Sequence, residues 1–200
     1  MIKIDLITGF LGSGKTTFLK QYAKYLMAQG KNIGILENDF GAVNVDMLLL
    51  QELRSDQCEL EMISGGCDKE THRRRFRTKL ISMGMSGYDR ILVEPSGIYD
   101  VDEPLNRWYE AGSVITILDA GLDEKLSEEE EYLLASEAAN AGKIMLSKVQ
   151  NVSEEKKEET IAHLNRTLEQ AGCRRQFSDA EILQKNWDDL TEDDFKMLTS

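Results

Sequence analysis

The chain has few cysteines, no long apolar run and a shortage of positive charge. Its three cysteines, at positions 58, 67 and 173, form no even disulfide framework, which favours a reducing compartment. No apolar run approaches the roughly 18 residues of a membrane-spanning helix. The 24 Lys and Arg residues are outnumbered by 36 Asp and Glu residues, and the net charge of -12 argues against sequence-independent binding of nucleic acid. We therefore expect a cytoplasmic protein that binds neither membrane nor nucleic acid.

The chain also lacks internal repeats, low-complexity segments and an evident linker. Two hundred residues suit one domain, which at this size buries roughly 70% of the surface of its unfolded chain. The sequence begins with a strand-like run, which leaves no room for a signal peptide. We expect a single domain over residues 1–200, with an acidic helical tail at 178–200.

A glycine-rich segment directly follows that first predicted strand, residues 2–7. Residues 9–16 read Gly-Phe-Leu-Gly-Ser-Gly-Lys-Thr and fit the phosphate-binding P-loop pattern G-x-x-x-x-G-K-[ST] at every position. From Thr16 onward, apolar residues recur at helical spacing up to Gly30, a natural helix stop. A strand, a glycine loop and a helix in this order are the context that the motif requires.

Each residue type in the motif has a separate chemical purpose. Gly9, Gly12 and Gly14 allow positive φ angles and let the backbone approach phosphate oxygens without a Cβ atom in the way. Backbone N–H groups of the loop and of the helix start then point at the anion. In this motif Lys15 reaches the β- and γ-phosphates, and the hydroxyl of Thr16 is a ligand of Mg²⁺.

Short apolar runs alternate with helical patterns along the rest of the chain. The residues predict strands at 33–36, 58–62, 90–93, 114–118 and 143–146, and helices at 68–83, 127–141 and 153–172. Residues 42–57 show no clean period and predict a switch-like loop with a short helix. Alternating strands and helices imply right-handed crossovers and a mainly parallel sheet covered by helices on both faces. The predicted fold class is therefore α/β, a three-layer P-loop NTPase.

Acidic side chains follow three of the predicted strands. Glu37 and Asp39 come after the second strand, Glu94 after the fourth and Asp119 after the fifth. In an open α/β sheet, ligands bind at the carboxyl ends of the strands. Glu37 and Asp39 are therefore predicted to lie near the phosphates, and Asp119 closes a strand at the same edge in a structural or supporting position.

Four segments together resemble one protein family. They are residues 9–17 (GFLGSGKTT), 37–46 (ENDFGAVNVD), 91–97 (ILVEPSG) and 114–120 (VITILDA). In this order and spacing they resemble the CobW/HypB/UreG group of P-loop GTPases, most closely its CobW branch, over roughly residues 1–150. The resemblance implies slow GTP hydrolysis coupled to delivery of a metal or cofactor to a client protein.

The resemblance also implies roles for individual residues. Glu94 would orient Mg²⁺ together with Thr16, and the N–H group of Gly97 would contact the γ-phosphate. Glu37 and Asp39 match acidic switch residues that hold the attacking water or a metal. Residues implied to bind the nucleotide are Gly9, Gly12, Ser13, Gly14, Lys15, Thr16, Thr17, Gly97, Ser147, Lys148 and Gln150. Turnover should be slow, because no arginine finger is evident in the chain itself.

Three features depart from the family pattern. The metal motif G-C-x-C-C reads Gly-Cys-Asp-Lys-Glu at 66–70, so Cys67 alone would make a weak site for Zn²⁺ or another transition metal. The guanine motif N-K-x-D reads Ser-Lys-Val-Gln at 147–150, and the missing carboxylate weakens selection of GTP and GDP over ATP. We expect no further C-terminal domain of the CobW type.

Several interpretations stay open at this stage. Cys67, Asp68, His72 and Glu37 could form a mixed metal site, or Cys67 is a buried thiol beside a solvated helix on which His72 is a surface residue. The basic run 73–77 is either a solvated helix face or a docking patch for an anion or a partner, including an arginine finger across a homodimer. Trp187 either packs within the protein or lies against the nucleotide base.

Three functions are compatible with these residues. The first is a Mg²⁺-dependent nucleoside-triphosphate hydrolase whose switch segment responds to the γ-phosphate. The second is a nucleotide-dependent binding module that docks on a client protein with negligible hydrolysis. The third is a small-molecule kinase, for which the basic helix is the only support.

Overall fold

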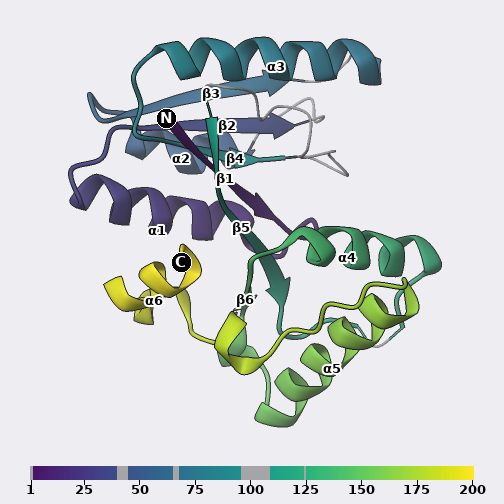
Figure 1. The fold of residues 1–200 in the computed structure, drawn as a ribbon. Helices are drawn as coiled ribbons and strands as arrows, with labels where there is room; N and C mark the ends of the chain where they lie inside the picture. Colours follow the sequence, from purple (N-terminus) through teal and green to yellow (C-terminus); the bar gives the residue numbers. More distant parts are fainter. Residues whose placement is uncertain (1, 40–44, 65–67, 96–108, 124) are drawn as a thin grey trace. The chain divides into compact units, whose positions relative to one another are not determined.

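A computed structural model describes residues 2–39, 45–64, 68–95, 109–123 and 125–200 (Figure 1). The strands follow the order β3-β2-β4-β1-β5-β6-β7, and every pairing described between them in residue detail is parallel. The predicted parallel α/β class is thereby confirmed. No helix in the described part of the chain is long and apolar enough to cross a membrane.

The chain divides into two compact units. The first unit comprises residues 1–7 and 16–112, and the second comprises residues 8–15 and 113–200. Lys15 and Thr16, neighbours in the P-loop motif, therefore belong to different units. Each unit is described by itself below.

The first unit is a parallel sheet with helices on both faces. Its strands are β1 (Ile2–Thr8), β2 (Ile33–Asp39), β3 (Cys58–Ser64) and β4 (Arg90–Glu94). Helix α3 (Lys69–Met85) lies on one side of these strands, and α1 (Lys15–Ala28) lies on the other (Figure 1). The short helices α2 (Val45–Leu50) and η1 (Gln51–Leu53) confirm the short helix expected within 42–57.

Apolar spacing explains why α1 forms and how it packs. Phe18, Leu19, Tyr22, Ala23 and Leu26 are buried on one face of the helix, as the three-and-four residue repeat predicts. Gly30, with φ at 74°, ends the helix and donates its N–H to the carbonyl of Met27. The helix that follows the P-loop is thus held by packing along its length.

A buried polar cluster lies beneath α1. The carboxylate of Asp5 in β1 is fully buried, and its Oδ2 accepts hydrogen bonds from the hydroxyl of Tyr22 at 2.8 Å and from Nη1 of Arg90 at 2.6 Å. The sequence offered no sign of this pairing, since these three residues come from separate elements. Removing the cation would leave a buried charge uncompensated, which costs about 3–5 kcal/mol.

The second unit contains the carboxyl-terminal strands and their helices. Its elements include β5 (Tyr109–Asp119), whose first residues belong to the first unit, and β6 (Lys143–Ser147) and β7 (Ile182–Leu183). Helices α4 (Glu128–Asn140) and α5 (Glu154–Gln170) contact each other, and α6 (Glu192–Leu198) lies near the end of the chain (Figure 1). Short 3-10 helices are η2 (Val149–Asn151), η3 (Asp179–Glu181) and η4 (Trp187–Asp189). The core of this unit includes Leu118, Leu134, Ile144, Leu146, Leu164, Leu168 and Phe177.

The structure corrects the prediction of a wholly helical tail. Ile182 and Leu183 form the short strand β7, which pairs in parallel with Ile144 and Met145 of β6. Both side chains are buried, so two apolar residues extend the sheet although they are too few to give a strand period in the sequence. The remainder of the tail is built of short helices, of which α6 begins with a capping box formed by Thr191 and Asp194.

Candidate functional site

The P-loop has the positive φ angles that its glycines were predicted to allow. Within the second unit, φ is 131° at Gly9, 77° at Gly12 and 98° at Gly14. A Cβ atom at Gly9 would lie 2.2 Å from the carbonyl oxygen of Ile117, whereas one at Gly12 would meet nothing within 4 Å. Gly9 is therefore required by close packing against β5, and Gly12 by its backbone conformation alone.

The carbonyl of Phe10 organises the loop from inside. It accepts the N–H of Ser13 at 3.1 Å and the Nζ of Lys15 at 3.0 Å. The side chain of Lys15 is half-buried, and this hydrogen bond holds its ammonium group against the backbone of the loop. A polyphosphate that bound here would take over the ammonium group from Phe10, since an anion is a stronger acceptor than a carbonyl.

Ser13 carries a buried hydroxyl inside the same loop. Its side chain is 2% exposed, and its Oγ atom has no hydrogen-bond partner among the described residues. A buried polar atom without a partner is rare in native proteins and calls for an explanation. A phosphate oxygen in the loop would supply the missing partner.

Glu137 of α4 is a member of this site that the sequence did not reveal. Burial raises the pKa of its carboxyl to about 7, although the nearby charge of Lys15 and a hydrogen bond from the backbone N–H of Gly9 act in the opposite direction. Its Oε2 atom is buried and has no partner among the described residues. Glu137 sits in a helix rich in Glu and Ala, so nothing in the pattern distinguished it from a solvated acid.

The loop at 147–150, where the family has its guanine motif, belongs to the same unit as residues 8–15 of the P-loop. Ser147, which ends β6, is buried, and Lys148, at φ 56°, directs its Nζ to Oδ2 of Asp119 at 2.5 Å. Gln150, where the family has its carboxylate, is exposed in η2. Trp187 approaches the loop from η4, so that a Cβ atom added to Gly14 would lie 3.1 Å from its ring.

The acidic residues predicted around Mg²⁺ belong to the first unit. Thr16, 8% exposed, donates from its hydroxyl to Oε2 of Glu94 at 3.3 Å. Glu37, 3% exposed, lies opposite Glu94 in the parallel register of β2 and β4. The structure thus brings the hydroxyl of Thr16 and two strand-end carboxylates to the same edge of one sheet. Thr17, also predicted to bind nucleotide, is exposed.

Several predicted residues lie outside the described part of the chain. These are Cys67, Gly97 and the side chain of Asp39. Within the part that is described, no group of three His, Cys, Asp or Glu residues could hold a metal ion. The mixed metal site therefore stays a prediction.

The surface position expected for His72 is wrong. The side chain is 1% exposed, and burial together with the positive charge of Arg75 lowers its pKa. The preceding Asp68 caps α3 instead of standing free, since its carboxylate accepts the N–H of Thr71. The run of arginines around His72 hid its burial, because neighbouring charges made the whole segment read as a solvated face.

The first unit offers oxygen donors that fit Mg²⁺, and the second offers a loop that fits a phosphate group. Mg²⁺ prefers hydroxyl, carboxylate and phosphate oxygens, which Thr16 and Glu94 and a bound nucleotide would supply. The orphan hydroxyl of Ser13 and the open space beside Gly12 fit an anion in the loop. The oxygen donors and the loop are therefore suited to Mg²⁺ and to the phosphates of a nucleotide, which the P-loop motif implies.

Curated relatives that resemble this chain are longer proteins. The zinc chaperone YjiA of Escherichia coli K12 is 29% identical over 182 residues, which is 82% of this chain and 55% of the relative. The zinc chaperone YeiR of the same organism is 31% identical over 192 residues, 90% of this chain and 56% of the relative. The chain thus spans about half the length of these relatives.

Solved structures agree at the level of the fold. HypB from Helicobacter pylori, crystallised in complex with nickel, has a TM-score of 0.61 at 16% identity, over 98% of this chain and 82% of that one. The model of the CobW/HypB/UreG nucleotide-binding domain matches residues 3–177, nearly the whole of the chain. The chain therefore belongs to the CobW/HypB/UreG family of P-loop proteins, through its nucleotide-binding domain.

Proposed function

We propose that the protein binds a nucleoside triphosphate with Mg²⁺ and hydrolyses it slowly, as a GTPase of the metallochaperone type. The observation that carries this proposal is the contact between Thr16, the last residue of the P-loop motif, and Glu94 at the carboxyl end of β4. A P-loop hydroxyl meeting a strand-end carboxylate is the arrangement that holds Mg²⁺ in P-loop enzymes. The relatives named zinc chaperones support the wider role in metal delivery.

The residues would divide the chemistry between them. Backbone N–H groups of the loop, the Ser13 hydroxyl and the ammonium of Lys15 would bind phosphate oxygens and neutralise charge that develops on them. Thr16 and Glu94 would hold Mg²⁺, which lowers the repulsion between the phosphates and the attacking water. Glu37 or Asp39 would orient that water, and the N–H of Gly97 would contact the γ-phosphate. Rate enhancement would come from positioning and electrostatics, with no covalent intermediate.

Base selection would depend on the loop at 147–150. The methylene chain of Lys148 would pack along the base, and its ammonium group already donates a hydrogen bond to Asp119. The exposed amide of Gln150 offers one acceptor oxygen where a carboxylate would offer two, so we propose a modest preference for GTP over ATP. Trp187, packed beside Gly14, would border the same region of the second unit.

Metal cargo would be held weakly by one protomer. Cys67 offers one thiolate, with Glu37 as a second candidate ligand, whereas Zn²⁺ usually takes four N or S ligands, or three and a water. We propose that a tight site for Zn²⁺ or another transition metal would need ligands from a client or from a homodimer partner. Work in the cytoplasm, where thiols stay reduced, suits this role.

The first test is removal of the P-loop cation. We expect Lys15→Ala to abolish binding of fluorescent GDP and the turnover of both GTP and ATP, because the phosphates lose their main counter-charge. The fold should survive, since Lys15 is half-buried and donates a hydrogen bond to the carbonyl of Phe10 within the P-loop itself. Lys31→Ala, at an exposed lysine outside the site, is the matched control.

The same assay separates the proposed hydrolase from a binding module. Binding with turnover supports the hydrolase, and binding without turnover supports a module that only senses the nucleotide. Wild-type affinity in Lys15→Ala, with an unchanged melting temperature, would show that the P-loop assignment is wrong.

A further inference from the structure

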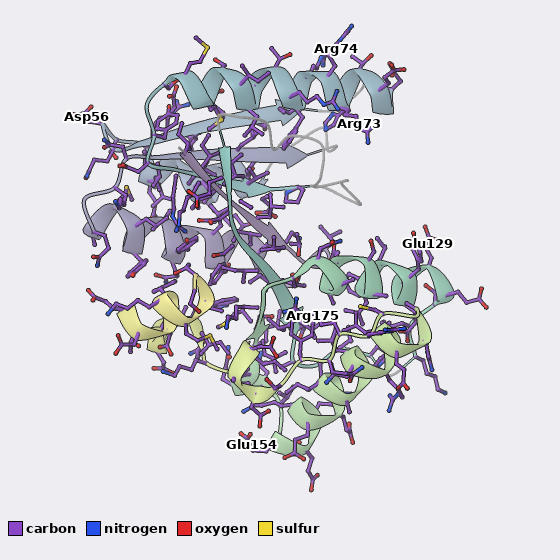
Figure 2. The ribbon with its side chains drawn as sticks, in the orientation of Figure 1. Asp56, Arg73, Arg74, Glu129, Glu154 and Arg175 are labelled. Carbon is purple, nitrogen blue, oxygen red and sulfur yellow. The ribbon has the colours of Figure 1, made fainter. Side chains whose placement is uncertain are left out.

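Helix α3 is strongly basic within an acidic chain. Its 17 residues hold six Lys and Arg side chains and one Glu, a net charge of +5, although the chain as a whole carries -12. The proposed hydrolysis makes no use of these cations. Arg73 and Arg74 extend from the first half of the helix (Figure 2).

A groove runs between this helix and the neighbouring strand β3. It has a volume of about 500 Å³ and is lined by Met62, Ile63, Arg74, Arg75, Thr78, Lys79 and Ser82. Successive strand residues point to opposite faces, so a groove that both Met62 and Ile63 line passes along the edge of the strand. Met62 leaves 37% of its surface exposed there, which provides an apolar floor.

The cations of the groove differ in how far they are neutralised. Lys79 pairs with Glu61 at 2.8 Å. Arg74 and Arg75 are exposed, and no ion pair of either guanidinium is found among the described residues. Two arginines next to each other, without counter-charges, create a local site for carboxylates, which guanidinium groups bind in bidentate fashion.

Strand β3 offers backbone partners beside these arginines. It is the outermost strand in the sheet order and pairs with β2 on one side. On the other side of β3, the described contacts lie near the start of the strand. Ser55 forms an isolated antiparallel β-bridge with Cys58, and Nη2 of Arg54 donates a hydrogen bond to the carbonyl of Leu60. No described strand pairs with that edge at Met62 and Ile63, where the groove lies. Open strand edges bind extended peptides through main-chain hydrogen bonds.

We propose that the groove between β3 and α3 binds an extended acidic peptide segment of a partner protein. The segment adds a strand at the edge of β3, its carboxylates pair with Arg74 and Arg75, and alternate apolar side chains cover Met62. Nucleic acid and anionic lipid are less suited, because neither offers the main-chain N–H and C=O groups that pair with an open strand edge. The net charge of -17 on the remainder of the chain also repels a long polyanion more strongly than a short peptide. The site needs no bound nucleotide, so its test does not depend on the proposed hydrolysis.

The test measures binding of a defined probe by fluorescence anisotropy. The probe is a fluorescein-labelled peptide of about eight residues in which Glu alternates with Val or Thr, as strand addition requires. We expect saturable binding to the wild type, and affinity at least about tenfold weaker for Arg74→Glu/Arg75→Glu, because two attractions become repulsions. The milder Arg74→Gln/Arg75→Gln should lie between the two.

A matched control changes charge to the same extent elsewhere. Lys31→Glu/Arg174→Glu reverses two exposed cations outside α3 and should keep the wild-type affinity. A second probe carries Pro at the alternate positions, which removes N–H donors, and should bind more weakly. Circular dichroism melts check that each variant is folded.

Four results would overturn the proposal. The first is that Lys31→Glu/Arg174→Glu loses as much affinity as Arg74→Glu/Arg75→Glu, and the second is that the proline probe binds as tightly as the glutamate probe. The third is that a thymidine oligonucleotide or phosphatidylserine vesicles bind more tightly than the glutamate probe through the same arginines. The fourth is that the wild type does not bind the glutamate probe. A fifth contrary result is self-association of the wild type that Arg74→Glu/Arg75→Glu abolishes, which would assign the groove to a second copy of the chain instead.

Discussion

Two glycines of the P-loop serve different physical purposes, although the motif treats them alike. Gly12 has a positive φ and open space where a Cβ atom would stand, so alanine there should cost about 1–2 kcal/mol for its left-handed backbone. Gly9 has a positive φ and also a carbonyl oxygen 2.2 Å from that position. We expect Gly9→Ala to reduce the free energy of unfolding in urea by clearly more than Gly12→Ala. Gly30→Ala, at another positive φ with open space, should behave like Gly12→Ala.

Gln150 is the residue at which base preference should be adjustable. A carboxylate accepts both adjacent donors of guanine, and each bidentate contact with a base is worth about 1–3 kcal/mol. We expect Gln150→Asp to increase the preference for GDP over ADP by about tenfold or more in titrations with fluorescent nucleotides. Because Gln150 is exposed, the substitution should leave the melting temperature unchanged. Gln150→Asn is the control, and a wild type that already prefers GDP by about a thousandfold would show that another residue reads the base.

Helix α4 contains two glutamates, Glu131 and Glu137, whose carboxyl pKa values are shifted in opposite directions by the folded structure. Glu131 accepts hydrogen bonds from Nε2 of His163 at 2.6 Å and from the hydroxyl of Thr167 at 2.5 Å, which join α4 to α5. Burial alone would raise the pKa of Glu131, but these bonds outweigh burial and lower it. Glu137, at the P-loop, has a pKa raised to about 7 by its burial.

These opposite shifts predict opposite pH dependences. The stabilisation from ionised Glu131 is present above the ordinary carboxyl pKa of 4.5 and is lost as pH falls below it. The folded state of Glu137 instead favours its proton, so stability is lost as pH rises from about 4.5 through about 7. We expect Glu131→Gln to destabilise the protein at neutral pH, by about 1 kcal/mol, and less so in acid. Glu137→Gln should stabilise it at about pH 8 and lose this advantage towards about pH 5.

Urea unfolding of both variants across this pH range checks the pair. Parallel pH profiles for the two variants would contradict the assignment of the shifts. A proton-linked Glu137 would also make nucleotide binding tighter as it becomes neutral, because its charge competes with the phosphates for Lys15.

At the scale of the whole molecule, the fold was predictable where local signals agreed with each other. The P-loop pattern, its flanking strand and helix, and the alternation of strands and helices all indicated a parallel α/β sheet, and the described strands confirm it. The register that sets Glu37 beside Glu94 also follows from this class, since parallel strands end at one edge.

Other features depended on contacts between distant residues, which no local pattern encodes. Asp5 and Arg90 are 85 positions apart, and nothing near either one announces a buried ion pair. Glu137 and His72 lie in segments of mixed charge, where burial cannot be inferred from spacing. Strand β7 has two residues, fewer than any periodic signal needs.

The concentration of positive charge on α3 has a consequence for the kinetics of encounter. In dilute salt the screening length is about 30 Å, so an acidic partner first senses the net charge of -12 and is repelled. Near 0.1 M salt the screening length is about 10 Å, and the partner senses the +5 of α3 only once it is close to that helix. Added salt should therefore speed association with an acidic partner, up to about that concentration, while it also speeds dissociation. A basic partner would show the opposite dependence of its association rate, so stopped-flow rates at several salt concentrations would reveal which kind of surface the protein meets.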